Sequence, residues 1–401
     1  MNATEARQLP LKSLKVLELG QLIAGPFATK LLGEFGADVI KIEPPGTGDP
    51  LRKWRMIEDG TSLWWHVQTR NKRSVALDLR SEEGQALVRK LATEADVVVE
   101  NFRPGTLENW GLGWEALSKL NPQLIMVHIS GYGQTGPYRD KPGFGVIGEA
   151  MGGLRYLTGQ PGEPSVRVGV SIGDSLSALY AVIGTLLALQ ERNRSGLGQE
   201  IDVALYESVF AMMESLLPEF DASGQVREPS GSALPGITPS NAYRCQGGDY
   251  VLIAGNGDSI FKRLMGVIGR DDLANDPDLA HNDGRSHQAE MIDAAIQTWT
   301  EERPRDAILQ ALDDARVPAG YPYTAEDIAF DPHYLAREMI QTFTRPNGKP
   351  LKVPGVLPKL SATPGRIGDG GPTLGQHTDD VLDELGIDHE TRAKLRQAGI
   401  I

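Results

Sequence analysis

The sequence predicts an α/β fold in which a parallel sheet is covered by helices on both faces. Short apolar segments typical of buried strands recur through the first third of the 401-residue chain. Segments with apolar residues at helical spacing separate them, the alternation expected of a parallel sheet. Charged residues make up 23% and hydrophobic residues 40% of the chain, a globular balance that argues against wholesale disorder. We therefore expect a large Rossmann-like core.

The elements follow from local composition, taken in chain order. Runs rich in Val, Ile and Leu predict strands at 14–20, 38–45, 73–79, 96–102, 124–130 and 249–256, with one more after Gly198. Helical spacing predicts helices from near Pro26, over 81–95, over 114–120 and from Ser175 to about Arg192. The last of these is apolar nearly all round, which predicts a core helix.

Two stretches rich in Pro and Gly divide the chain. Residues 221–240 are polar and predict a domain boundary or a mobile loop, after which a smaller α/β region runs to about residue 330. A second such stretch covers 346–377, and a loop of this length usually wraps over something or serves a partner subunit.

Composition disfavours several classes of function. A net charge of -13 makes a nucleic-acid groove or an anionic membrane a poor partner. Cys245 is the only cysteine, and the seven histidines form no metal-binding motif, so we expect neither a disulfide nor a metal. The N-terminus lacks a signal-type apolar core, and the apolar run 176–189 is too short to span a bilayer. These observations predict a cytoplasmic protein.

The stretch RVGVSIGDSLSALYAVIGTLLAL sets one carboxylate, Asp174, at the start of a long apolar run. Asp is preferred at helix starts, so Asp174 either is the N-cap, which contributes about 1 kcal/mol, or lies in the first turn behind Ser171, and pattern alone favours this structural role. A helix N-terminus also keeps a carboxylate ionised, and an ionised, partly desolvated carboxylate can attack an activated acyl group. The spacing leaves both interpretations open.

The first strand-to-helix turn, LELGQLIAGPF, lies where open α/β sheets bind ligands. Gly20 and Gly25 do not form the dinucleotide pattern, and Pro26 stands where a P-loop needs Lys. No G-x-S-x-G elbow occurs either. Nicotinamide dehydrogenases, P-loop NTPases and serine hydrolases are therefore disfavoured.

Two basic motifs adjoin predicted strands. TRNKRS holds Arg70, Lys72 and Arg73, which form either a solvated face or a phosphate clamp. ENFRPG follows a buried strand, so Arg103 is a second candidate phosphate ligand. Phe102 in that motif is either a stacking face or an ordinary packing residue.

Several segments together resemble the class III coenzyme A transferases, the family of formyl-CoA and carnitine CoA-transferases. They recur in family order from the N-terminus almost to the C-terminus: AGPFATKLLGEFGADVIKIEPPGTGD, NKRSVALDL, DVVVENFRPGTLENWGLG, GYGQTGPYRDKPGF, GDSLSALYAVIGTLLAL, GQEIDVAL and LGQHTDDVL. Each segment alone is a weak signal, but the set is specific.

The resemblance implies a mechanism for Asp174. In this family the acid that opens the central helix attacks the donor thioester, giving a mixed anhydride and CoA thiolate. The thiolate returns to form an aspartyl-CoA thioester, and the acceptor carboxylate then reverses the sequence. Acyl-CoA is the substrate and no tightly bound cofactor is needed. The acceptor would be a small carboxylate or dicarboxylate, with succinyl-CoA as a possible donor.

The resemblance also implies binding residues and an architecture. CoA contacts map onto the backbone of Ile23 and Ala24 and onto Arg70, Asn71, Lys72, Asn101, Phe102 and Arg103. The family forms an interlocked homodimer whose large Rossmann-like domain comes from both chain ends, here 1–220 plus 331–401, with a smaller inserted domain at 221–330. The loop near 231–240 occupies the place of a family segment that closes over the intermediate.

Departures from the family leave alternatives open. Formyl-CoA enzymes have Gln where this chain has Ile23, and Glu near Gly145, so formate is a doubtful substrate. Racemases of the same superfamily place a His-Asp pair where this chain has Phe144 and Gly145, which favours transfer over racemisation. An α-methylacyl-CoA racemase and a non-catalytic CoA-binding protein are the alternatives. Arg52 and Arg55 are either carboxylate clamps for the acceptor or solvated surface residues.

Overall fold

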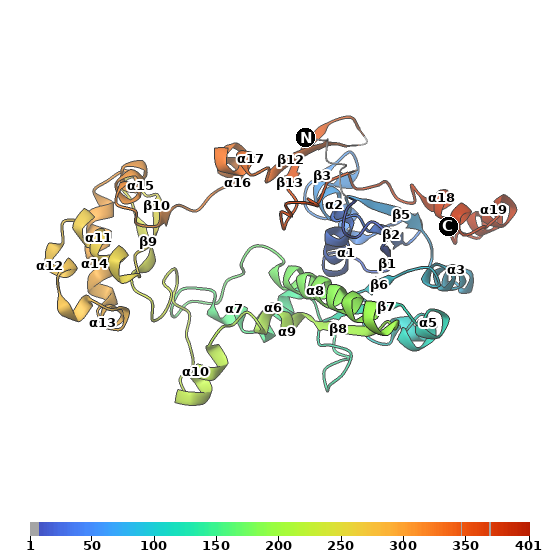
Figure 1. Cartoon of the computed structure of the whole chain (residues 1–401), viewed down its shortest axis with the longest axis horizontal. Coiled ribbons are helices and arrows are strands. Elements are labelled where there is room, and N and C mark those ends of the chain that lie inside the picture. Colours follow the sequence, from blue (N-terminus) through green and yellow to red (C-terminus); the bar gives the residue numbers. More distant parts are fainter. Residues whose placement is uncertain (1–7, 346, 369) are drawn as a thin grey trace. The chain divides into compact units, whose positions relative to one another are not determined.

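The computed structural model describes residues 8–345, 347–368 and 370–401, which divide into two compact units (Figure 1). The first unit contains the described residues up to Arg155, Val168–Gly224 and Leu335–Ile401. The second contains Tyr156–Arg167 and Gln225–Tyr334. Most of the segment predicted as a small domain, 221–330, therefore falls in the second unit, which also takes in a short stretch before the long central helix.

The first unit is built on a six-stranded parallel sheet. Its strand order is β5(Lys72–Ala76), β2(Asp38–Glu43), β1(Lys15–Glu18), β6(Val97–Glu100), β7(Ile125–Ser130) and β8(Glu200–Ala204). Val16 of β1 pairs with Val39 on one side and with Val97 on the other, so β1 lies in the middle of the sheet. The prediction of an α/β fold with a parallel central sheet is confirmed.

Helices cover both faces of this sheet. On one face α1(Ala24–Glu34) and α8(Ile172–Ser195) share a core with the sheet valines and isoleucines. On the other face lie α3(Glu82–Ala92), α5(Trp114–Leu120), α18(Thr378–Glu384) and α19(His389–Gln397). The chain's C-terminal helices thus complete the core begun by its N-terminal half (Figure 1).

The helices begin where their sequences provide caps and dipole partners. The Ser81 hydroxyl accepts a hydrogen bond from the amide of Gly84 at 3.0 Å, and Glu82 and Glu83 occupy the first turn of α3. Acidic residues at this end and Arg89 at the other complement the helix dipole.

The remaining elements of the first unit are short. They are η1(Pro50–Lys53), β3(Ile57–Glu58), β4(Thr61–Ser62), α2(Leu63–Gln68), α4(Thr106–Asn109), α6(Gly145–Met151), α9(Leu205–Phe210), α10(Leu216–Ser223), β12(Ile340–Thr344) and β13(Pro350–Pro354). The helix α7(Leu154–Leu157) begins in the first unit and ends in the second. The stretch predicted to wrap over something does so along its own unit. The backbone amide of Arg366 donates to the Glu34 carbonyl at 2.8 Å, and the Pro372 carbonyl accepts from Trp65 Nε1 at 3.0 Å.

The second unit has its own core. A three-stranded antiparallel sheet has the order β11(Ala319–Gly320), β10(Tyr250–Ala254) and β9(Ser240–Arg244). The helices are α11(Asp258–Val267), α12(Asp271–Ala274), η2(Pro277–Leu279), α13(Asn282–His287), α14(Ala289–Glu301), α15(Arg305–Asp314) and α16(Ala325–Phe330), followed by α17(Pro332–Ala336) at the return to the first unit. Val251, Leu264 and Ile296 are fully buried at its centre.

The central helix α8 differs from its prediction as an all-round buried helix. Its small residues face the core, and Ala178 and Ala181 are buried. Its large residues are exposed on another face: Leu179, Ile183, Leu186 and Leu187. At 24 residues α8 is also long and apolar enough to cross a bilayer, a test that core helices pass as well. The apolar composition of α8 indicates that its surface is to be buried, but it does not indicate which part of the protein or which partner buries it.

Candidate active site

Asp174 lies in the first turn of α8, half-buried, at the position where the helix dipole favours an ionised carboxylate. The N-cap residue is Ser171, whose side chain makes no capping hydrogen bond. The prediction that Asp174 is the N-cap is therefore wrong, and the alternative place in the first turn behind Ser171 is correct.

The Asp174 carboxylate rests against Gly145, the first residue of α6. A Cβ atom built on Gly145 would lie only 2.9 Å from the carboxylate carbon of Asp174, closer than any normal contact. One turn further along α6, the buried Glu149 accepts a hydrogen bond from the Gly173 amide at 3.5 Å. The Asp174 carboxylate can lie where it does only because residue 145 has no side chain.

A cavity of about 160 Å³ opens in front of Asp174. Its walls come from the loops that follow the carboxyl ends of β1, β6 and β7, where open α/β sheets bind ligands. The residues predicted from sequence that line it are Ala24, Asn101, Phe102, Arg103 and Asp174. Arg139 and Lys141, both exposed, add two further cations to the wall.

The loop after β1 is held rigidly on both sides. Asn101 accepts a hydrogen bond from the Gln21 amide at 2.7 Å and donates one to the Gln21 carbonyl at 2.9 Å. The Leu22 amide donates to both carboxylate oxygens of Asp49 at 3.1 Å, with Leu22 at a φ of 65°. A non-glycine residue in this left-handed region is strained by about 1 kcal/mol or more, so these bonds hold the loop in place.

Buried charges support that loop from below. Lys41 Nζ lies 2.7 Å from Glu18, 2.9 Å from Asp49 and 2.9 Å from the Gly20 carbonyl. Lys72 Nζ lies 2.8 Å from the second oxygen of Glu18. Burial by itself raises the pKa of Glu18, but the charges of the two lysines outweigh it and lower the pKa to about 2.

The neighbouring loop is anchored in the same way. The Phe102 amide donates to Glu100 Oε2 at 2.7 Å, and the other Glu100 oxygen lies 2.6 Å from Nδ1 of the buried His128. Burial raises the pKa of Glu100. Burial alone lowers the pKa of His128, but the hydrogen bond and charge of Glu100 more than offset it, so the pKa is raised. The carboxylate therefore fixes where the Phe102 loop begins.

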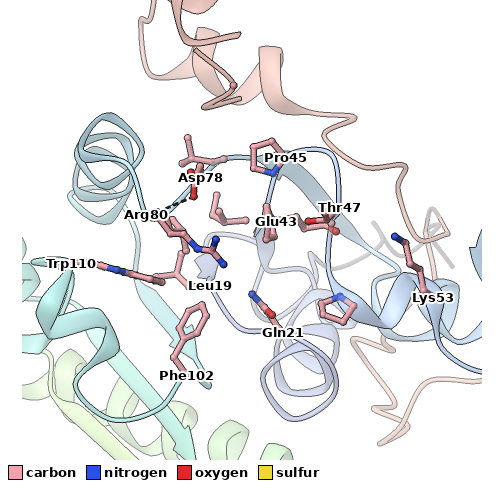
Figure 2. Close-up of a pocket in the computed structure, with 17 residues that line it drawn as sticks. Leu19, Gln21, Glu43, Pro45, Thr47, Lys53, Asp78, Arg80, Phe102 and Trp110 are labelled. Carbon is pink, nitrogen blue, oxygen red and sulfur yellow. Dashed lines mark hydrogen bonds between the residues drawn. The ribbon is translucent and has the colours of Figure 1, made fainter. Parts of the chain in front are cut away.

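A second, larger cavity of about 660 Å³ adjoins the first, and Figure 2 shows its lining. Gln21 and Phe102 line both cavities. Arg80 and Lys53 bring exposed cations from opposite sides (Figure 2). Trp110 meets Phe102 edge-on with ring centroids 5.5 Å apart.

Arg80, Lys53 and Trp110 were not predicted from the sequence. Arg80 comes four residues after β5, so the rule that drew attention to Arg103 after β6 applies to it equally. Lys53 and Trp110 carry no such local signal, because loops distant in sequence bring them to the cavity.

Four of the predicted CoA contacts line neither cavity: Ile23, Arg70, Asn71 and Lys72. Arg70 is fully buried and its guanidinium is paired with Glu34, with Nε at 2.6 Å. Asn71 binds the C-terminal segment by donating to the Arg366 carbonyl at 2.7 Å. Burial lowers the pKa of Lys72 to about 8, although Glu18 opposes this. The CoA contacts of all four residues stay predictions, and the geometry gives Arg70, Asn71 and Lys72 internal partners.

The two candidate carboxylate clamps, Arg52 and Arg55, have different environments in the structure. Arg52 is buried and its guanidinium is occupied by Glu43, with Nε to Oε2 at 2.7 Å and Nη2 to Oε1 at 2.8 Å. Both interpretations of Arg52 are therefore wrong: it is buried, so it is not a solvated surface residue, and both edges of its donor fork are already used, so it does not bind an acceptor. Arg55 is exposed and stacks on Trp64, with the guanidinium carbon 4.3 Å from the ring centroid.

Within residues 8–345, 347–368 and 370–401, no group of three or more His, Cys, Asp or Glu side chains is arranged to hold a metal ion. The lining of the two cavities includes the half-buried carboxylate of Asp174, the further acids Glu43 and Asp78, several cations, and the aromatic rings of Phe102, Trp110 and Phe144.

Comparison with known proteins gives consistent matches. The model of CoA-transferase family III matches residues 11–378. The chain is 50% identical to the succinyl-CoA–D-citramalate CoA-transferase of Chloroflexus aurantiacus, over 98% of each chain. It is 37% identical to the succinate–glutarate CoA-transferase of Agrobacterium fabrum, over 94% of this chain and 96% of that one. A CAIB/BAIF family protein from Brucella suis superposes with a TM-score of 0.82 and 36% identity, over 94% of this chain and all of that one.

Proposed function

Since the chain belongs to family III of the CoA-transferases, we propose that it moves CoA from an acyl-CoA donor to a small carboxylic acid with Asp174 as nucleophile. The observation that carries this proposal is the position of Asp174: a half-buried carboxylate in the first turn of α8, facing a cavity that adjoins a second, cationic one. An ionised carboxylate at such a place attacks a thioester carbonyl without needing a base.

The reaction proceeds by exchange of acyl partners. An Asp174 oxygen adds to the donor carbonyl and the C–S bond breaks, which forms an aspartyl mixed anhydride and releases CoA as thiolate. The thiolate attacks the aspartyl carbonyl, which releases the donor acid and leaves an aspartyl-CoA thioester. The acceptor carboxylate then attacks the aspartyl-CoA thioester, which forms a second mixed anhydride and releases CoA thiolate. The thiolate attacks the acceptor's carbonyl in that anhydride, which gives the new acyl-CoA and restores the Asp174 carboxylate. No bond energy is lost overall, so no ATP is consumed.

We place the CoA nucleotide in the 660 Å³ cavity. Arg80 and Lys53 supply positive charge for phosphates, and Phe102 and Trp110 supply aromatic faces for the adenine. The pantetheine arm then passes Gln21 and Phe102, which line both cavities, and brings its sulfur to Asp174.

The substrates are inferred from relatives. The names of two similar enzymes contain succinyl-CoA or succinate together with a second dicarboxylic acid, citramalate or glutarate. We therefore propose succinyl-CoA as donor and a four- or five-carbon dicarboxylic acid as acceptor.

The assembly is part of the same proposal. The exposed face of α8 carries Leu179, Ile183, Leu186 and Leu187, a row of large apolar side chains that calls for cover. We propose that a second copy of the chain covers it in an interlocked homodimer. The cytoplasmic location stays a prediction.

Trapping of the intermediate tests this function. The protein is incubated with succinyl-CoA, treated with hydroxylamine or borohydride, and digested for mass spectrometry. We expect modification at Asp174 and none in Asp174→Asn, which should also lose turnover while remaining folded. Exchange of the α-proton with D₂O without modification would instead indicate a racemase, and neither signal would indicate CoA binding alone. An Asp174→Asn protein with intact turnover would refute the proposal.

A further inference from the structure

A third cavity, of about 390 Å³, lies beside the start of α8. On the basis of the proposed function, we propose that it receives the remote carboxylate of a dicarboxylic acid and that Arg55 is the residue that binds it. This would make Arg55 the determinant that selects dicarboxylic over monocarboxylic acids.

The cavity shares two structural elements with the Asp174 site. Ser171 and Ser175 line it, three residues before and one residue after Asp174, so it opens against the same helical turn. Ile23 also lines it, whereas Leu22 and Ala24 line the Asp174 cavity. The segment from 22 to 24 is therefore a wall common to both spaces, and a substrate anchored at Asp174 has this cavity as its neighbour.

The lining suits a short carbon chain that ends in a charge. Most of the wall is apolar, from Phe27, Leu31, Val67, Val170 and Leu357. Arg55 adds a guanidinium that is held flat on Trp64. Within the part of the chain that the structure describes, Arg55 forms no ion pair with a carboxylate. A planar, pre-oriented fork with unused donors is the group that binds a carboxylate with two parallel hydrogen bonds.

The other two charged residues in the wall, Lys30 and Glu34, lie against each other. Glu34 lines the cavity, but it is paired with Arg70, and Lys30 Nζ lies 3.6 Å from its Oε1. Burial lowers the pKa of Lys30 to about 8, with Glu34 acting in the opposite direction, so Lys30 remains mostly protonated at pH 7. One carboxylate thus faces two internal cations, and the positive charge of Arg55 is left for a ligand.

The proposal also explains why Arg52 and Arg55, three residues apart, do different things. Arg52 is used inside the protein by Glu43. Arg55 has a φ of 59°, which turns the chain after η1 and leaves the side chain over Trp64 at the cavity. Only the second arginine is therefore available to substrate.

Steady-state kinetics with matched acceptors tests the inference. With saturating succinyl-CoA, kcat/KM is measured for two acceptors, glutarate and butyrate. Butyrate is glutarate without its second carboxyl group. Loss of a charge-assisted carboxylate contact should lower the glutarate-to-butyrate ratio by about 10- to 100-fold in Arg55→Gln. Arg55→Lys should restore part of the ratio, because it retains the charge but not the fork.

A matched control and a separate readout keep the result unambiguous. Lys53→Gln alters the CoA cavity instead and should raise the KM of the donor while leaving the glutarate-to-butyrate ratio unchanged. If Asp174 is still trapped with succinyl-CoA but Arg55→Gln keeps the ratio within twofold, the inference about this cavity is wrong and the proposed function stands. If Asp174 is not trapped in the unaltered protein, the proposed function itself fails.

Discussion

Gly145 is the position where one added methyl group tests the site most directly. In Gly145→Ala the new Cβ would lie 2.9 Å from the Asp174 carboxylate carbon and nearer still to one of its oxygens. The carboxylate must therefore move by about 1 Å to regain a normal contact, because non-bonded carbon atoms prefer about 3.5 Å or more.

The consequence for catalysis can be estimated from that displacement. A reacting group misplaced by about 1 Å costs on the order of 100-fold in rate. The fold should lose little, since Gly to Ala at a helical position gains about 0.5–1 kcal/mol in backbone entropy, which offsets part of the clash. We therefore expect Gly145→Ala to have kcat lowered by about 100-fold and a nearly unchanged unfolding midpoint.

Initial-rate kinetics and urea denaturation, run side by side, measure both quantities. Gly266→Ala is the matched control, because it is also a helical glycine and a Cβ there meets nothing within 4 Å. It should leave kcat unchanged. A Gly145→Ala protein with full kcat would show that the contact with Asp174 has no bearing on the reaction, and the geometric argument would be refuted.

Two further predictions concern the CoA cavity and the buried charges. Arg80→Ala should raise the KM of succinyl-CoA about tenfold or more with little change in kcat, because Arg80 supplies charge for the phosphates. The control is Arg194→Ala, which alters an exposed arginine away from the cavity. An unaltered KM in Arg80→Ala would contradict the placement of phosphates near Arg80. Glu18 has its pKa lowered from 4.5 to about 2, so its contribution of up to about 3 kcal/mol is present above pH 4.5 and is lost as the pH falls from 4.5 towards 2. Urea unfolding across that range should show a smaller acid loss in Glu18→Gln than in the unaltered protein, whereas parallel curves would contradict the shift.

The strands were predicted well from the sequence because a buried parallel strand is a continuous run of apolar residues. The run at 96–102 became β6(Val97–Glu100) and the run at 38–45 became β2(Asp38–Glu43), with ends shortened by a few residues. Each such strand is apolar because both of its faces are covered, so consecutive residues must all be apolar.

Charged residues were harder to interpret, because their partners are distant in sequence. Arg70 and Arg52 were candidates for substrate contact, but each is paired with a carboxylate, Glu34 or Glu43, at a separation that no local pattern reveals. A buried cation must be neutralised, and which acid does so depends on how the loops pack.

By itself the sequence determined the order of strands and helices, the position of Asp174 at the start of a long helix, and its resemblance to one family of enzymes. Only the tertiary structure decided which cations remain available to a ligand, and that residue 145 must lack a side chain for the Asp174 carboxylate to lie where it does. The physical reason is the range of the forces. Hydrophobic periodicity can be recognised from residues that are close in the sequence. Charge compensation and close contact, in contrast, depend on groups that become neighbours only after folding.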